Sequence, residues 1–222
     1  MGKVVRSLLV AGNEKLAPSI MHFDVPAGVA CPGKSQLCFT RCYARRGRFA
    51  FPQVRDRLQW SYEQSKRGDF VRRMCDELFR KGVLLMRWHV AGDVYSPAYA
   101  RKMLEIMGNS LHTTFWLYTR SWRVKRIYPF LDAMSQLSNV KLWLSADSET
   151  GYPAVVPVNA RVAWMQTEAG DDMEQADLVF LDHPLRKKTI PLTVIDKVCP
   201  TETPEGKARG TSCATCQFCW KE

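Results

Sequence analysis

The stretch Val83-Leu84-Leu85-Met86-Arg87-Trp88-His89-Val90-Ala91-Gly92-Asp93 decides the fold, because it is an apolar run of strand length that ends in Gly-Asp. We expect a strand over residues 83–91. Side chains alternate between the two faces of a strand. One face of this strand, which we expect to pack under helices, contains Leu84, Met86, Trp88 and Val90. The opposite face contains Arg87, His89 and Asp93. Burying a polar group without a partner costs roughly 2–7 kcal/mol even when the group is neutral. The pattern therefore predicts a polar site on that face.

Segments of strand length alternate with amphipathic segments of helix length along the chain. Such alternation is typical of α/β proteins, in which crossover helices join parallel strands. We expect the strands over residues 19–25, 83–91, 113–119, 140–146, 161–166 and 178–181. We expect the helices over residues 52–66, 69–81, 97–107 and 123–135, with a short helix near 171–176.

Polar residues stand at or just past the carboxyl ends of four of these strands, namely Asp93, Arg120, Asp147 and His183. Ligands bind at this end of the sheet in parallel α/β architectures. Ser145 shares a strand face with Asp147. Each residue taken alone also fits a helix cap or a surface ion pair, but the coincidence on four separate strands favours a binding site.

Three cysteines follow the first expected strand in the run Cys31-x6-Cys38-x3-Cys42. A four-iron cluster is normally held by four cysteines, so three thiolates bind three irons and leave the last iron open for a substrate or a cofactor. Zinc is the alternative, but structural zinc sites usually pair their ligands in C-x2–4-C hooks and close at four. The nearest histidine is His22, which lies outside the loop. The spacing therefore favours an iron–sulfur cluster.

A second group of cysteines lies near the C-terminus and consists of Cys199, Cys213, Cys216 and Cys219. Four ligands make a closed site. Cys-x2-Cys-x2-Cys with a separate Cys-Pro is the pattern of bacterial ferredoxins, although Cys199-Pro200 comes first here, and zinc remains an alternative. The eighth cysteine, Cys75, is interpreted as a core thiol. Disulfide bonds are the other interpretation of these residues, and metal binding is favoured because seven of the eight cysteines fall into two groups.

The length of 222 residues and the hydrophobic content of 46% suit one large domain with a small addition. Because prolines and glycines punctuate the chain after residue 183, we expect a domain over residues 1–183 and a metal-held appendage over residues 184–222. A membrane span requires about 18 apolar residues in a run, which this chain lacks, and its N-terminus does not resemble an export signal. We therefore expect a cytoplasmic protein without a membrane partner.

The formal net charge of +10 predicts attraction to polyanions. The excess is concentrated, since residues 41–73 contain ten Lys or Arg and three Asp or Glu. Cations that meet phosphates, beside rings that stack on bases, form a nucleic-acid surface. The alternative is a solvated helix face with its rings turned inward. The aromatic residues that alternate with the cations are Tyr43, Phe49, Phe51, Trp60 and Tyr62.

The run Cys42-Tyr43-Ala44, the Gly92-Asp93 ending of the second strand and the series of β/α units together resemble radical S-adenosylmethionine enzymes. The likeness is greatest to phage gene-product families with a C-x6-C-x2-3-C-Y-A loop. It covers residues 19–183 and implies a partial (β/α)6 barrel with a [4Fe-4S] cluster on the three N-terminal cysteines. The open iron would bind the amino and carboxylate groups of S-adenosylmethionine. The resemblance also admits an auxiliary [4Fe-4S] cluster on the C-terminal cysteines.

The resemblance further implies residues for the cofactor. A Gly-Gly-Glu-like motif contacts the methionyl amine in this superfamily, and Ala91, Gly92 and Asp93 occupy the matching positions. The aromatic residue beside the last cysteine, here Tyr43, lies near the adenine. The common loop is C-x3-C-x2-C with the aromatic residue before the last cysteine, whereas here both spacings differ and Tyr43 follows it. The other candidates are Arg120, Ser145 and Asp147, for the methionyl carboxylate or the ribose, and His89 and Arg87, facing cofactor or substrate.

These features imply an enzyme that cleaves S-adenosylmethionine reductively to methionine and a 5′-deoxyadenosyl radical. The expected partners are S-adenosylmethionine, a reductant such as flavodoxin or ferredoxin, and a nucleic acid or a related metabolite as substrate. No catalytic acid, base or radical relay is predicted. Two other functions fit the same residues. One is a non-enzymatic iron–sulfur or zinc protein that binds nucleic acid, and the other is an electron-transfer protein that uses both clusters.

Overall fold

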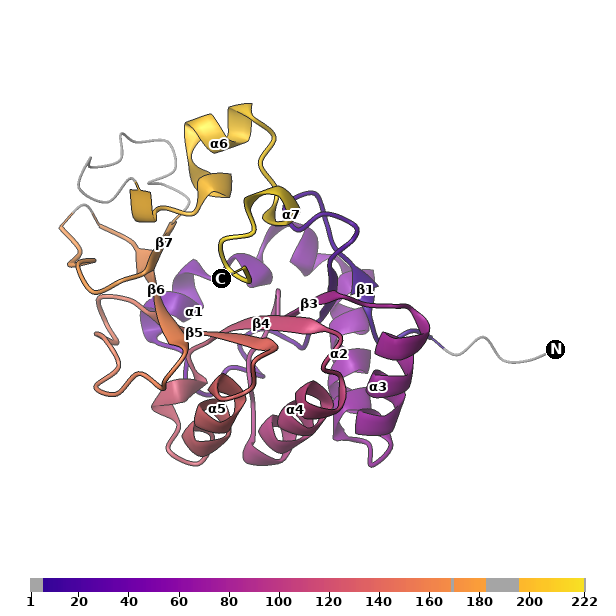
Figure 1. Ribbon diagram of the computed structural model, residues 1–222. Coiled ribbons are helices and arrows are strands. Elements are labelled where there is room, and N and C mark those ends of the chain that lie inside the picture. Colours follow the sequence, from indigo (N-terminus) through magenta and orange to yellow (C-terminus); the bar gives the residue numbers. More distant parts are fainter. Residues whose placement is uncertain (1–5, 169, 183–195, 222) are drawn as a thin grey trace.

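The computed structural model describes residues 6–168, 170–182 and 196–221. Its centre is a seven-stranded sheet whose strands lie side by side in chain order, from β1 to β7 (Figure 1). β1 pairs antiparallel with β2, and each later pair is parallel. The strands are β1 (Val10–Ala11), β2 (Met21–Phe23), β3 (Leu85–Trp88), β4 (Thr114–Thr119), β5 (Val140–Ala146), β6 (Ala160–Gln166) and β7 (Leu178–Leu181).

Helices fill the connections from β2 to β5. Those between β2 and β5 are α1 (Gln36–Arg41), α2 (Pro52–Lys66), α3 (Phe70–Arg80), α4 (Pro97–Asn109) and α5 (Tyr128–Ser135). The C-terminal segment adds α6 (Pro204–Ala208) and α7 (Cys213–Cys216). Short 3₁₀ helices are η1 (Tyr43–Arg45), η2 (Gly47–Ala50), η3 (Ser121–Arg123) and η6 (Pro200–Glu202).

The order of the strands explains where the helices lie. Right-handed crossovers that always advance in one direction place every helix on the same face of a parallel sheet. Accordingly α3, α4 and α5 lie together below the sheet (Figure 1). The main core lies between these helices and the sheet, where Met74, Met103, Leu131 and Phe115 are fully buried. The opposite face needs another cover.

That cover is the C-terminal segment. Val198 forms a parallel bridge to Val179, and the indole N–H of Trp143 donates to the Cys219 carbonyl at 2.9 Å. Trp220 packs in a cluster with Trp116 of β4. The described residues 196–221 therefore lie against the sheet. The boundary that the sequence predicts at residues 183–184 falls outside the described residues, as does His183.

The alternation predicted for β3 holds only to Trp88. Met86 and Trp88 are fully buried on the helix side, and Arg87 lies beside Trp116 on the other side. His89 has a backbone φ of +61°, which turns the chain, and its Nε2 lies 2.9 Å from the Tyr99 hydroxyl of α4. The expectation that His89 shares a face with Arg87 is therefore wrong. Strand alternation does not continue through a left-handed residue.

Two neighbours of that strand also depart from the expected faces. Leu84 precedes β3 and is 72% exposed. Val90 follows the turn at His89 and packs with Leu16, Ile20 and Trp116, on the face that the C-terminal segment covers. Both residues lie outside the regular strand, so its alternation does not apply to them.

The expected helix near residues 171–176 is not formed; these residues make turns. Asp171 accepts the Thr167 N–H at 2.8 Å, and Asp177 accepts the Val162 N–H at 2.8 Å. Such side-chain bonds compete with a helix. The connection from β5 to β6 also contains no helix, so a complete (β/α)6 repeat is not formed within the described residues. The sheet has two edges, β1 and β7, and is open.

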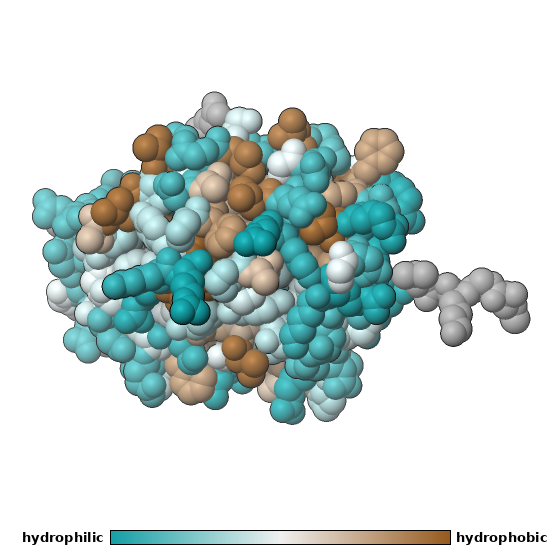
Figure 2. Space-filling model, turned by 90° about the horizontal axis from the view of Figure 1, so that it is seen from below, coloured by the Kyte–Doolittle hydropathy of each residue, from teal (hydrophilic) through white to brown (hydrophobic). Residues whose placement is uncertain are grey.

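Most other elements lie where the sequence places them: α2, β5 and β7 have the expected bounds. The two-residue strand β1 and the helix α1 inside the cysteine loop were not expected. The outer helical face is mostly hydrophilic, with scattered hydrophobic groups (Figure 2). No helix in the part of the chain that the structure describes has the length and apolarity of a membrane span.

Candidate functional site

The N-terminal cysteine loop is attached to the carboxyl end of β5. Ser35 caps α1, accepting the Cys38 N–H at 2.9 Å, and its hydroxyl donates to Asp147 Oδ2 at 2.7 Å. Glu149 accepts the N–H groups of Gln36 at 2.9 Å and Leu37 at 2.7 Å. An uncapped helix start leaves such N–H groups without partners. These bonds therefore fix α1, and with it Cys38, at the end of the strand.

The same loop lies directly on the end of β4. A Cβ atom at Gly33 would stand 2.0 Å from the Arg120 carbonyl oxygen, so only glycine allows this approach. The guanidinium of Arg123 donates to the Gly33 carbonyl at 3.0 Å. The loop is thus held across two strand ends.

The three thiols of the loop lie in one electrostatic environment. Burial raises the pKa of Cys31 to about 12, with further contributions from Asp93, Cys38 and Cys42. Burial also raises the pKa of Cys38, and the Arg120 guanidinium opposes that shift. Asp93 and Cys42 contribute to the pKa of both thiols, so the loop cysteines lie within electrostatic range of the end of β3.

No metal site is formed among residues 6–168, 170–182 and 196–221, because no three or more His, Cys, Asp or Glu side chains lie close enough together to hold an ion. All eight cysteines are free thiols, and the disulfide interpretation receives no support from the structure.

Asp93 joins the ends of β3 and β4. Its buried carboxylate accepts the Thr119 hydroxyl at 2.5 Å, the Arg120 N–H at 2.9 Å and the Val94 N–H at 2.7 Å. Burial raises the pKa of Asp93, and these hydrogen bonds oppose that shift. The carboxylate expected to contact the methionyl amine is thus already engaged with the protein.

Arg120 and Asp147 form a buried ion pair. Arg120 Nη1 lies 2.7 Å from Asp147 Oδ2, and both side chains are at most 8% exposed. The other Asp147 oxygen accepts the N–H groups of Glu149 at 3.1 Å and Thr150 at 2.9 Å. With Ser35 as a further donor, Asp147 is fully hydrogen-bonded inside the protein. Both residues lie at the predicted place, where their observed contacts position the loop.

The turn at residues 90–93 is held closely against β2. Gly92 has a φ of +83°, and a Cβ atom there would stand 2.4 Å from a methyl carbon of Val25. Asp24 Oδ1 accepts the N–H groups of Val90 at 2.6 Å and Ala91 at 3.2 Å. Gly92 is therefore required by the fold, whatever ligand binds beside it.

The predicted residue Tyr43 lies at this turn, and the nearby His22 was not predicted as a site residue. The Tyr43 hydroxyl donates to the Val90 carbonyl at 2.5 Å, while 56% of the residue's surface is exposed. Tyr43 is thus anchored near Ala91–Asp93 with part of its ring open. His22 Nδ1 lies 2.6 Å from Asp24 Oδ2, and the pKa of Asp24 is lowered by this histidine although burial opposes the shift.

Two predicted residues do not join the site. His89 faces Tyr99, and burial lowers its pKa to about 4. Ser145 lies on the predicted face of β5, where its backbone carbonyl accepts the Trp122 indole N–H at 2.8 Å. Asp24, Ser35 and Glu149 were missed. The signal for Asp24 was its place directly after a strand, and the signal for Ser35 was its place before a helix start.

The C-terminal cysteines form a second group on the sheet face. Cys199, Cys213, Cys216 and Cys219 line one small cavity. Burial raises the pKa of Cys219 to about 12 and also raises the pKa of Cys213. Ser212 and Thr215 form a capping box on α7, and the Cys213 N–H donates to the Lys15 carbonyl at 2.8 Å. The sequence prediction that these four residues share one place is consistent with this geometry.

A partly buried arginine, Arg87, accompanies this second group. The Arg87 guanidinium lies 5.2 Å above the Tyr118 ring and forms no ion pair with any carboxylate among the described residues. Arg87 Nε is buried without a hydrogen bond. Burial opposes the charged form of Arg87, but Tyr43 and Tyr118, followed by Cys213 and Cys219, hold its pKa above the ordinary value. Lys15, also close, is neutralised by Glu202 at 3.1 Å.

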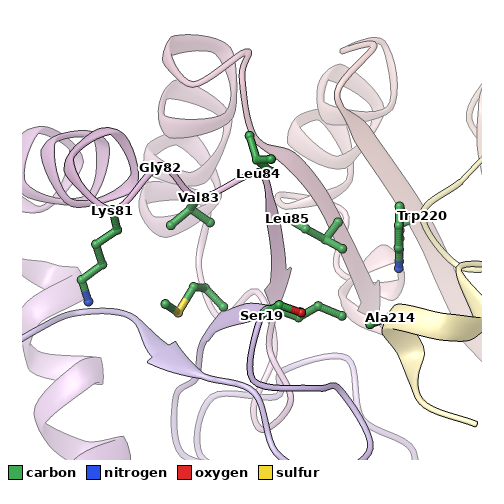
Figure 3. A pocket seen from close by; sticks show the side chains of 10 residues that line it. Ser19, Lys81, Gly82, Val83, Leu84, Leu85, Ala214 and Trp220 are labelled. Carbon is green, nitrogen blue, oxygen red and sulfur yellow. The ribbon is translucent and has the colours of Figure 1, made fainter.

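A cavity of about 370 Å³ lies elsewhere, at the amino ends of β2 and β3. Leu84, Leu85 and Trp220 line it, with Lys81 at one side (Figure 3). The Lys81 ammonium is engaged by Glu77 at 2.9 Å. The cavity is at the opposite end of the strands from the cysteine loop, so it is not part of that site.

The fold and site define a mixed α/β protein with an open, mostly parallel sheet and a cysteine loop at the carboxyl ends of its strands. Residues 6–222 match the model of the family described as Gene product 88, and the chain belongs to this family. Comparison with curated proteins and with solved structures gives no match. The family description fits the expected likeness to a gene-product family. It carries no activity, so the likeness to radical S-adenosylmethionine enzymes stays a prediction.

Proposed function

We propose that the protein is a radical S-adenosylmethionine enzyme of the cytoplasm whose sheet corresponds to an incomplete β/α barrel. The observation that carries this proposal is the position of the loop with three cysteines, which Ser35 and Gly33 hold against the carboxyl ends of β5 and β4. Ligands are expected at this end of the sheet. The loop has no fourth cysteine for a closed cluster, because the other grouped cysteines belong to the C-terminal segment and line a separate cavity.

The residues present fit a [4Fe-4S] cluster at the loop. Cys31, Cys38 and Cys42 would hold three irons, and the Arg120 guanidinium favours the thiolate form of Cys38. When bound, the cluster would supply one electron from a reductant such as flavodoxin or ferredoxin to S-adenosylmethionine, releasing methionine and a 5′-deoxyadenosyl radical. The protein's task is orientation and exclusion of water.

The chain's own residues would act mainly through position. Gly92 lets the 90–93 turn approach β2, and Asp93 fixes that turn to β4. The backbone of Ala91–Asp93 and the partly exposed Tyr43 ring are our candidates for contact with S-adenosylmethionine. Arg120 and Asp147 hold the loop in place, which revises their predicted role as direct ligands of the cofactor.

The C-terminal group fits an anionic metal centre. Four thiolates around an iron–sulfur cluster or a zinc ion carry net negative charge. Arg87 is a partly buried cation whose Nε is buried without a hydrogen bond, and it has no carboxylate partner among the described residues, whereas buried charges are normally paired. We therefore assign Arg87 as the counter-ion of this centre, which we propose to be the auxiliary [4Fe-4S] cluster.

The test is anaerobic reconstitution with iron and sulfide, followed by addition of dithionite and S-adenosylmethionine. We expect about eight irons per chain, as two four-iron clusters require, a paramagnetic signal that changes when S-adenosylmethionine is added, and formation of 5′-deoxyadenosine. Cys38→Ser is expected to abolish 5′-deoxyadenosine, whereas Cys75→Ser, a control outside both groups, is expected to retain it. Zinc alone in the purified protein, with no iron uptake, would overturn the proposal.

A non-enzymatic metal protein is the second candidate. It is favoured by the bonds of Asp93 and Asp147, whose carboxylates are occupied by protein donors. This function predicts that both groups bind metal while no 5′-deoxyadenosine forms. The reconstitution separates the two candidates in one experiment.

A further inference from the structure

The polypeptide around the cysteine loop is unusually one-sided in charge. Residues 25–55 contain six Lys or Arg and no Asp or Glu. Of these cations, Arg45, Arg46, Arg48 and Arg55 are exposed. A cluster of this kind, with no acidic residue in its own segment, attracts polyanions.

The arginines of α3 supply a comparison on the same protein. On α3 the charges are neutralised locally: Arg72 lies 3.3 Å from Asp76, and Arg73 lies 3.9 Å from Asp69. Arg48 and Arg55 form no ion pair with a described residue. A solvated helix face of mixed charge thus describes α3 and does not describe the segment at residues 45–55.

Some of the arginines are held in fixed positions. Arg45 lies 3.7 Å above the Phe39 ring and donates to the Phe39 carbonyl at 3.0 Å. Arg46 donates to the Thr40 carbonyl at 2.5 Å. These bonds use only part of each guanidinium, which has five N–H donors. The remaining donors stay available in a pre-organised array.

Exposed rings accompany the arginines. Phe51 is 51% exposed and Tyr43 is 56% exposed. Cations together with rings are the features of single-strand binding surfaces, where phosphates meet the cations and bases stack on the rings. A membrane surface would instead require a continuous apolar face, whereas α2 exposes mainly polar side chains.

The surface borders the cysteine site. Cys42 stands between Arg41 and Tyr43, and Tyr43 is anchored to the turn that precedes Asp93. Arg41 lies 3.3 Å from Asp182, just past the end of β7. A single-stranded nucleic acid bound along the arginines would therefore pass close to the cysteine thiols.

We propose that Arg45, Arg46, Arg48, Arg55 and Phe51, here called the 45–55 surface, bind single-stranded nucleic acid and present a nucleotide to the cysteine site. The proposal names the substrate class of that site and rests on the proposed function for the chemistry there. The binding itself does not depend on the cluster being active.

The test measures fluorescence anisotropy of labelled single-stranded DNA and RNA of about 16 nucleotides, the upper site size of single-strand-binding folds. The full chain is used without reductant or S-adenosylmethionine. Each lost phosphate contact lowers the slope of log affinity against log salt by about 0.7 on a single strand. Arg48→Gln/Arg55→Gln is expected to lower the slope by about 1.4. Arg72→Gln/Arg80→Gln removes the same number of charges from α3 and is expected to leave the salt slope unchanged.

Phe51→Ala tests the stacking, and Phe79→Ala is its control, because Phe79 is an exposed ring on α3. We expect at least about a fivefold loss of affinity for Phe51→Ala, the lower end for loss of one stacked base, and none for Phe79→Ala. Thermal unfolding confirms that each variant is folded. Equal losses in the variants and their controls would overturn the proposal, as would anionic vesicles binding more tightly than the oligonucleotides. A protein that forms 5′-deoxyadenosine but fails this test retains the proposed function and loses only the substrate class.

Discussion

The two cysteine groups differ in how their surroundings balance charge. At the N-terminal loop, the charge of Arg120 is balanced by the carboxylate of Asp147 in an ion pair. At the C-terminal group, Arg87 has no carboxylate partner among the described residues. Under the proposed function, three cysteines leave one iron open and four close the site. The charge of Arg87 would then be balanced only when the C-terminal group holds an anionic metal centre.

The largest expected effect comes from breaking the Arg120–Asp147 ion pair at the N-terminal cysteine loop. Asp147→Ala leaves Arg120 buried without its partner, and loss of one member of a buried pair typically costs about 3–5 kcal/mol. We expect a fall of that size in the free energy of unfolding, measured by urea denaturation. Asp76→Ala removes a carboxylate from an exposed pair and is expected to cost at most about 1 kcal/mol. Similar costs in both variants would mean that the Arg120–Asp147 pair does not hold the loop.

The next effect concerns His89, which stands in the chain between Arg87 and the turn at residues 90–93. Burial lowers its pKa to about 4 from 6.5, so the folded protein favours the neutral ring. Its contribution to stability is full above pH 6.5 and is lost as the pH falls from 6.5 toward 4, by about 3 kcal/mol in total.

The measurement is urea unfolding at about pH 7 and about pH 4.5, on either side of most of this titration. His89→Asn removes the titrating ring and tolerates the left-handed backbone. We expect this variant to lose less stability on acidification than the parent protein does. An equal loss in both proteins would assign the pH dependence to other groups.

The smallest expected effect concerns Arg87, the charged neighbour of the C-terminal cysteine group. In metal-free protein, Arg87→Met removes a buried donor that lacks a partner, and we expect the free energy of unfolding to rise by about 1–3 kcal/mol. In the metal-loaded protein the same change removes the counter-ion, and we expect weaker metal retention against a chelator. Opposite signs in the two states support Arg87 as the counter-ion. The same sign in both states would reduce Arg87 to a packing residue.

Much of the fold was predictable because local patterns determine it. The strands of β5 and β7 and the helix α2 follow directly from apolar runs and from a proline at the helix start. The expected helix near residues 171–176 failed because Asp171 and Asp177 bond to backbone groups of other segments. Periodicity does not record such competition.

The sequence predicted where the residues of the candidate site lie, but it predicted only some of their contacts. Asp93, Arg120 and Asp147 lie at strand ends as expected, because parallel strands bring their carboxyl ends to one edge. Their partners were not predictable: Ser35 reaches Asp147 across 112 positions of the chain. His89 was placed on the wrong face because one left-handed residue redirects its side chain.

The sequence by itself determined the class of fold, the two groups of cysteines and the basic segment around the first of them. These are properties of composition and short spacing, which neighbouring residues fix without help from the rest of the chain. Only the tertiary structure decided that the C-terminal cysteines cover the open face of the sheet and that Arg87 lies beside them. Long-range packing decides which charged side chains become neighbours, and burial raises the free-energy cost of each charge that has no partner.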